Sequence, residues 1–192
     1  MSHSVESNQL AYQLISLMRT SPTTRSMLSR MAQTLGQTFQ ADFCLFVAST
    51  GIRPKIRTGF WDRKESTELP FEINKQFFLS SAIAEILTTT EPLAIVDSGD
   101  ASWLEELSAR LPSGQRQGRS LLGITTYFQN NANGIIMVGY LQPHQSTKQE
   151  CEWLQAASEV SAIAVLYGST RDSNQSQFRS SSLPLTGPKE VL

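Results

Sequence analysis

The sequence is short of histidine and cysteine, the side chains that most often carry nucleophilic, acid–base and metal chemistry. Its 192 residues include only two histidines, His3 and His144, and two cysteines, Cys44 and Cys151. The motifs GxxxxGK[ST], GxGxxG, HExxH and GxSxG are absent. His-based catalysis and a metal site of three or more His or Cys ligands therefore lack support, so we expect a non-enzymatic chain without a metal.

Long apolar runs and an excess of charge of one sign are absent as well. No segment approaches the roughly 20 apolar residues that span a bilayer, and the N-terminus does not resemble a secretory signal. The net charge is -1, and the 17% of residues that are charged are of mixed sign, so the charge gives no reason to expect nucleic acid or an anionic membrane as a partner. We expect a cytoplasmic protein, because two cysteines fit a reducing compartment.

What is present is a strong hairpin pattern between Arg119 and Leu141. Two apolar runs flank the segment Gln129–Gly134, in which the Asn133-Gly134 pair can supply positive φ, so the pattern predicts a β-hairpin. Both faces of each run are apolar, which implies cover above and below. The hairpin therefore predicts an α/β/α sandwich with a central antiparallel sheet of five or six strands.

The second run and the segment after it resemble the C-terminal half of a GAF domain. The run reads Gly-Ile-Ile-Met-Val-Gly-Tyr-Leu, and a short polar loop leads to a helical pattern from Glu150 to Ala164. Two further segments are similar to the same family: a helix that leads into the apolar run Ala41–Ser49, and Thr-Glu-Pro followed by Leu93–Asp97. The resemblance implies a GAF-like α/β (α+β) fold.

Periodicity predicts the remaining elements. A narrow stripe over residues 8–19 predicts a helix that needs a partner, and a second helix runs from Pro22 to about Phe39. Pro54 restricts the segment Ile52–Phe60 to an edge strand. The other expected elements are a helix over Phe77–Thr88, a short helix ended by Pro112, and a last helix that Thr147–Glu150 opens as a capping box and Gly168 closes.

These elements divide the chain into three parts. Residues 1–20 form an N-terminal helix for dimerisation or signalling, and residues 21–168 form the GAF-like domain. Residues 169–192 are rich in serine and have no apolar period, so we expect a disordered linker or tail.

The resemblance implies a ligand pocket between one sheet face and the segments 61–78 and 97–119. Aromatic side chains at helical or strand spacing are also typical of plain core, and loop arginines are commonly solvated. Arg116 and Arg119 are candidates to meet an anionic group of the ligand. The aromatic candidates for the lining are Trp61, Phe77, Trp103, Tyr127 and Tyr140.

The cofactor is unknown from the sequence, although two ligands of the family can be weighed. GAF domains that bind bilins covalently place a Cys before the central hairpin, and the segment Asp100–Arg119 contains none, which argues against a covalent bilin. The cyclic-nucleotide type carries an Asn-Lys pair followed by Phe-x-x-x-Asp-Glu. Asn74-Lys75 is present but the second motif is not, which weighs against a cyclic nucleotide.

The two cysteines are alternative candidates for redox sensing. Cys44 lies in a predicted strand, where a small buried hydrophobic residue is the simpler interpretation. Cys151 lies in the first turn of the last helix, where the helix dipole lowers a thiol pKa, but Glu150 and Glu152 oppose the thiolate.

The leading hypothesis is a regulatory GAF sensor module that binds a small molecule or partner and relays a signal through its terminal helices. We expect a homodimer through these helices and a host such as a sensor histidine kinase of a two-component system. The alternatives are a stand-alone interaction module without a ligand, a thiol sensor, and a methionine sulfoxide reductase of GAF fold, for which no Cys-rich active loop is present.

Overall fold

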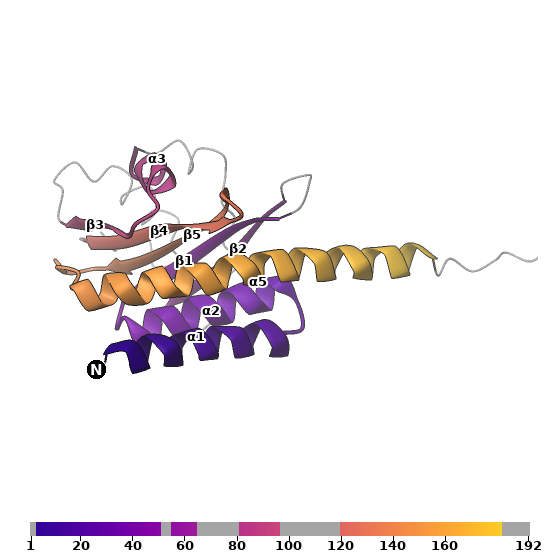
Figure 1. Ribbon diagram of the computed structural model, residues 1–192, viewed down its shortest axis with the longest axis horizontal. Helices are drawn as coiled ribbons and strands as arrows, with labels where there is room; N and C mark the ends of the chain where they lie inside the picture. The colour runs from indigo at the N-terminus through magenta and orange to yellow at the C-terminus, as the bar shows by residue number, and fades with distance from the viewer. Residues whose placement is uncertain (1–2, 51–54, 65–80, 97–119, 182–192) are drawn as a thin grey trace, which may run out of the picture.

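The computed structural model describes residues 3–50, 55–64, 81–96 and 120–181. A sheet lies between α3 on one side and α1, α2 and α5 on the other, so the expected three-layer α/β/α architecture is confirmed (Figure 1). The elements in chain order are α1 (His3–Thr20), α2 (Thr24–Thr38), β1 (Phe43–Thr50), β2 (Lys55–Asp62), α3 (Ser81–Thr88), β3 (Leu93–Val96), β4 (Ser120–Phe128), β5 (Asn131–Tyr140) and α5 (Lys148–Ser181).

The sheet has five strands in the order β2-β1-β5-β4-β3, and every neighbouring pair is antiparallel. β2 is an edge strand, as the proline before it predicts. The other edge is the four-residue strand β3. The short helix predicted before Pro112 lies outside the described residues.

Alternation along the strands separates two cores, and a register shift between Thr126 and Tyr127, opposite Asn133, interrupts it in the hairpin. Cys44 and Phe46 of β1, with Ile136 and Val138 of β5, face α1, α2 and α5; we call this side of the sheet the helical face. Their neighbours in the sequence point to the opposite side, which α3 covers and which we call the α3 face. A hairpin that is apolar on both faces therefore has both faces buried, as predicted.

The turn of the central hairpin lies at the start of the predicted segment Gln129–Gly134, four residues before the Asn133-Gly134 pair. Phe128 pairs with Asn131, and Gln129 and Asn130 between them adopt positive φ values of 48° and 63°. Asn133 and Gly134 belong to β5 instead. Gly134 is needed there because a Cβ atom would lie 2.7 Å from the carbonyl oxygen of Val47, on the neighbouring strand.

The helical face is closed by two helices from the start of the chain. α1 buries the stripe that includes Leu10 and Leu14, and its partners are α2 and α5 of the same chain. α2 begins later than expected, because Thr23 acts as its N-cap and accepts a hydrogen bond from the Ser26 amide at 3.1 Å. Met27, Met31 and Leu35 of α2 are then fully buried against the sheet.

The last helix is longer than the sequence predicts. The capping box is confirmed, since the Glu150 amide donates to Thr147 Oγ1 at 3.1 Å and the Thr147 amide donates to Glu150 Oε2 at 2.7 Å. The expected end at Gly168 and the disordered segment from residue 169 are wrong as far as Ser181, because α5 is helical throughout. Gly168 serves close packing: a Cβ there would lie 2.8 Å from Thr24 Oγ1.

None of the helices within the described ranges combines the length and the apolar character that crossing a membrane requires.

Candidate functional site

The α3 face of the sheet is the surface on which the family resemblance places a ligand. Its described side chains form an apolar floor, and Ile83 and Ile86 of α3 are buried on it at 1% and 0% exposure. A surface of this composition favours apolar and aromatic groups over charged ones. The floor consists of Phe43, Leu45, Val47, Phe60, Leu121, Ile135 and Met137.

Two hydroxyl groups of β4 hold α3 on this floor. Thr125 donates a hydrogen bond to the carbonyl oxygen of Ile86 at 2.7 Å, and Tyr127 donates to the carbonyl oxygen of Leu87 at 3.2 Å. The last carbonyl groups of a helix have no partner within it. Side chains from the sheet therefore satisfy the C-terminal end of α3.

The structure separates the predicted pocket residues. Tyr127 lies on the α3 face, whereas Trp61 and Tyr140 pack into the helical face, so these three aromatic side chains do not surround one space. Trp61 covers Gly36 of α2, where a Cβ atom would lie 2.1 Å from the indole ring. The other candidates, Phe77, Trp103, Arg116 and Arg119, lie outside the described residues.

A polar cluster at the end of β5 was not foreseen from the sequence. His144 stacks on Tyr140 with ring centroids 3.9 Å apart, and its Nε2 atom lies 2.9 Å from Glu150 Oε1. Ser120 accepts a hydrogen bond from the His144 amide at 2.7 Å, which joins the loop to the start of β4. The capping-box pattern identified Glu150, but only the fold brings His144 to it.

Electrostatics in this cluster follow from burial and charge. Burial raises the pKa of Tyr140, and the neighbouring Glu150 carboxylate raises it further. Burial by itself would raise the pKa of Glu150. Hydrogen bonds from Thr147 and the proximity of His144 outweigh burial, so the pKa of Glu150 is lowered. The lowered pKa keeps this carboxylate charged at neutral pH.

Neither cysteine has the surroundings of a reactive thiol. Cys44 is fully buried on the helical face, and burial strongly raises its pKa. Burial also raises the pKa of Cys151, and Glu150 and Glu152 add to the increase. Both thiols are free and are held in their protonated, weakly nucleophilic form.

The terminal helices expose large apolar side chains. Five of the seven exposed large apolar side chains in the described ranges lie on α1 and α5, which pack against each other. A shallow groove of about 510 Å³ runs along α1, and it is lined by Asn8, Gln9, Tyr12, Gln13 and Ser16. We call the five exposed apolar residues the terminal-helix patch: Tyr12, Ile15, Ile163, Leu166 and Tyr167.

Comparison with known proteins adds the family and the fold. The family model described as GAF domain matches residues 23–165, and no curated protein matches the sequence. The similar solved structures named next are at most 15% identical in sequence to this chain, so their similarity shows the fold alone. The GAF domain of a phosphoenolpyruvate-protein phosphotransferase from Coxiella burnetii is similar, with a TM-score of 0.61 and 15% identity over 87% of this chain and 96% of that one. The phycoerythrobilin-bound GAF domain of a cyanobacterial phytochrome has a TM-score of 0.62 and 10% identity over 86% of this chain and 97% of that one. Free methionine-R-sulfoxide reductase from Neisseria meningitidis has a TM-score of 0.54 and 11% identity over 90% of this chain and 94% of that one.

Proposed function

The chain belongs to the GAF domain family, and from this premise we propose that it is a regulatory sensor module that dimerises through its terminal helices. A small molecule or partner acts at the α3 face, and α1 and α5 carry the resulting change to an output domain. The proposed host is a cytoplasmic signalling protein such as a sensor histidine kinase of a two-component system.

The observation that carries this proposal is the terminal-helix patch. Tyr12 is 74% exposed, Ile163 53% and Tyr167 46%, while other residues of the same two helices are fully buried in the helical face. Each helix thus has one apolar stripe facing its own sheet and further apolar residues facing outward. Exposed apolar residues on two helices that pack against each other are typical of a protein–protein contact, and a second copy offers the same residues in return.

The course of α5 supports a role in signal output. α5 continues for 34 residues and extends beyond the sheet, away from the N-terminus of α1 (Figure 1). A displacement of α5 where it packs on the sheet would therefore also move the C-terminal part of the helix, and with it the proposed output domain.

The ligand side of the proposal rests on the apolar floor beneath α3. Tyr127 is the described pocket candidate on this face, and we propose that Phe77, Trp103, Arg116 and Arg119 complete a pocket with it. Trp61 and Tyr140 are not included, because they pack on the helical face. The floor favours a ligand with an apolar or aromatic body, and the arginines would meet an anionic group.

The alternatives are an interaction module without a ligand, a thiol sensor and a reductase. Thiol chemistry is disfavoured because the surroundings of Cys44 and Cys151 raise both pKa values. The phytochrome domain in the comparison is bilin-bound, but no cysteine lies between residues 97 and 119 of this chain, so we do not extend that ligand to it.

Sedimentation velocity over a range of concentrations tests the dimer. The unaltered chain is expected to sediment as a dimer, and Leu166→Asp is expected to weaken dimerisation about 30-fold or more, as loss of a central interface contact does. Val96→Asp is a matched control, because Val96 is 46% exposed but lies on the sheet edge. A monomeric wild-type chain at high concentration, or a fully dimeric Leu166→Asp variant, would contradict the proposal.

A thermal-shift panel of small molecules tests the ligand. We expect stabilisation by compounds with an aromatic body and an anionic group, and loss of that stabilisation in Tyr127→Ala. A stable dimer that no compound stabilises would favour the interaction module without a ligand.

A further inference from the structure

Three consecutive residues of β4 make hydrogen bonds on both faces of the sheet. Thr125 and Tyr127 point to the α3 face and bind the carbonyl groups of Ile86 and Leu87. Thr126, between them, points to the helical face. Because successive side chains of a strand alternate, this one short segment reaches both sides of the sheet.

On the helical face the connection passes through Asn133 of β5. Thr126 Oγ1 donates to Asn133 Oδ1 at 2.7 Å, and Asn133 Nδ2 donates to the carbonyl oxygen of Ala162 at 2.8 Å. Thr126 has 0% exposure, so the hydroxyl group meets no solvent. Asn133 thus joins the hairpin to the middle of α5, beside Ile163 of the terminal-helix patch.

Packing and hydrogen bonds limit how far the ends of this connection can move separately. The Ile86 side chain lies so near Gly123 that a Cβ atom there would be 2.6 Å from Ile86 Cδ1. A Cβ at Gly134 would lie 2.8 Å from Thr126 Oγ1, so the hairpin is tightly packed at that hydroxyl group. A shift of α3 that keeps the hydrogen bonds from Thr125 and Tyr127 therefore displaces β4, and a displaced Thr126 must break its hydrogen bond or move Asn133.

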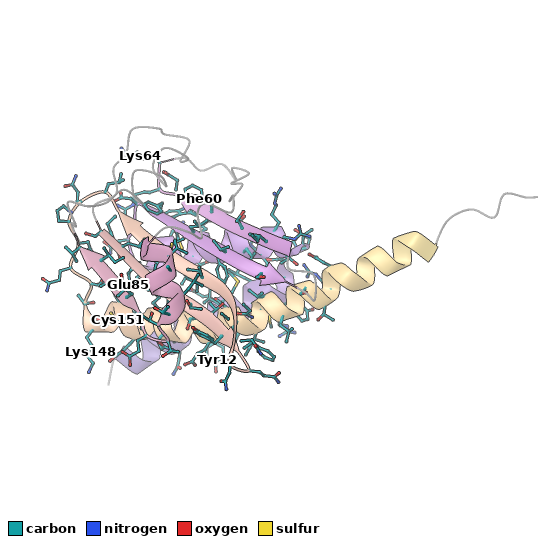
Figure 2. The ribbon with its side chains drawn as sticks, turned by 90° about the horizontal axis from the view of Figure 1, so that it is seen from above. Tyr12, Phe60, Lys64, Glu85, Lys148 and Cys151 are labelled. Carbon is teal, nitrogen blue, oxygen red and sulfur yellow. The ribbon has the colours of Figure 1, made fainter. Side chains whose placement is uncertain are left out.

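We propose that Thr125, Thr126, Tyr127 and Asn133 form a hydrogen-bonded relay through the sheet, which couples the position of α3 to α5 at Ala162. This inference deepens the proposed function and rests on it for its direction, from a ligand at the α3 face to the terminal helices. The α3 segment is the part that a ligand can bias, since in the described ranges α3 is the one helix on that face (Figure 2). A ligand that binds one position of α3 more tightly shifts α5 through the same four side chains.

Amide hydrogen exchange, followed residue by residue by NMR in the full chain, tests the relay. Thr125→Val preserves shape and removes the bond to α3. It should accelerate exchange about tenfold at the C-terminal end of α3, as expected for one lost buried hydrogen bond, and about threefold or more at residues 163–167 of α5. Rates are compared with amides of α2, which report global unfolding.

The background variant Asn133→Ala isolates the pathway. With the connection to α5 already absent, adding Thr125→Val should still accelerate exchange in α3 but should have no additional effect in α5. Thr88→Val is the matched control, because the Thr88 hydroxyl donates to Glu85 within α3 and does not reach the sheet. It should leave α5 unchanged.

The relay is overturned if Thr125→Val changes α3 but leaves residues 163–167 at the wild-type rate. It is also overturned if the α5 effect persists undiminished with Asn133→Ala. Should Thr125→Val fail to fold, Tyr127→Phe removes the second bond to α3 at a half-buried position and is subject to the same criteria. Leu166→Asp monomers can be measured in the same way, so failure of the relay and failure of the dimer are separable.

Discussion

The two faces of the sheet are closed by different means. On the helical face α1, α2 and α5 bury a continuous core, and backbone lies directly against backbone where Gly59 of β2 meets α2. On the α3 face a helix of eight residues rests on the floor through Ile83 and Ile86 and is tied by two hydroxyl groups. The difference suggests that stability comes mainly from the helical face and that adjustment is possible mainly at α3.

Glycine-to-alanine substitutions on the two faces should give the largest contrast. A Cβ at Gly59 would lie 2.2 Å from the Leu28 carbonyl carbon and 2.5 Å from the Ser29 amide nitrogen, and neither can move without displacing α2. We expect Gly59→Ala to lower the free energy of unfolding by about 3 kcal/mol or more. Denaturant unfolding monitored by circular dichroism measures the loss.

Gly123→Ala is the corresponding change on the α3 face. Its Cβ would meet the end of the flexible Ile86 side chain, which can rotate, so we expect a loss of about 1 kcal/mol. Equal losses for the two variants would show that the faces do not differ in rigidity.

The second contrast concerns the part of α5 beyond the family match. Arg171 donates from Nη1 to the Ser21 carbonyl oxygen at 2.7 Å, at the turn between α1 and α2, where a cation also favours the C-terminal dipole of α1. Arg171→Met should cost about 1.5 kcal/mol, because it removes a charge-assisted hydrogen bond. Thermal and denaturant unfolding measure it.

A chain that ends at Asp172 is the control for Arg171→Met. It retains Arg171 and loses residues 173–192, which include the end of α5, so we expect stability within about 0.5 kcal/mol of the full chain. A large loss of stability on truncation would mean that residues after Asp172 also contribute to the packing of α5.

The sequence predicted the layers because a strand that is buried on both sides reads as a nearly continuous apolar run. It misplaced the turn because Asn133-Gly134 satisfies the local preference for positive φ equally well. That error affects the pocket: a turn at Asn133-Gly134 would make Tyr127 and Tyr140 direct partners on one face, whereas the observed pairs are Tyr127 with Ala132 and Tyr140 with Ser120. Register, set by the tertiary contacts of Asn133 and Gly134, separates the two tyrosines.

Gly168 shows the same limit for helices. A glycine followed by polar residues is typical of a helix end, and no local feature distinguishes it from a glycine that permits close packing. The close approach of α5 to Thr24 is a contact between residues far apart in the sequence. The exposed patch escaped notice for a related reason, since α1 and α5 each carry apolar residues on two sides and only the fold shows which side is buried.

The third contrast lies in the pH dependence of the helical face. The lowered pKa of Glu150 means that its carboxylate stabilises the fold at neutral pH, and that this contribution falls away as the pH drops below about 4.3 and through the folded-state pKa. Glu150→Gln retains the capping geometry but not the charge, so it should cost about 1 kcal/mol at neutral pH and progressively less in acid. Urea unfolding across that pH range measures the difference.

Glu152→Gln controls for the loss of a negative charge in the same helical turn, because Glu152 is more than half exposed and pairs only with Lys148 in the described ranges. If it reproduced the pH dependence of Glu150→Gln, net charge rather than the polar cluster would be responsible.

The smallest expected effect is that of the ion pair between β2 and α5. Arg57 Nη2 lies 3.9 Å from Asp172 Oδ2, and both side chains are about one-third exposed, so solvent and salt screen the attraction. Asp172→Asn should cost less than about 0.5 kcal/mol, and the cost should vanish in high salt. If Asp172→Asn instead lowered stability as much as Arg171→Met does, and independently of salt, the ion pair with β2 would hold α5 in place rather than the contact of Arg171 with the α1–α2 turn.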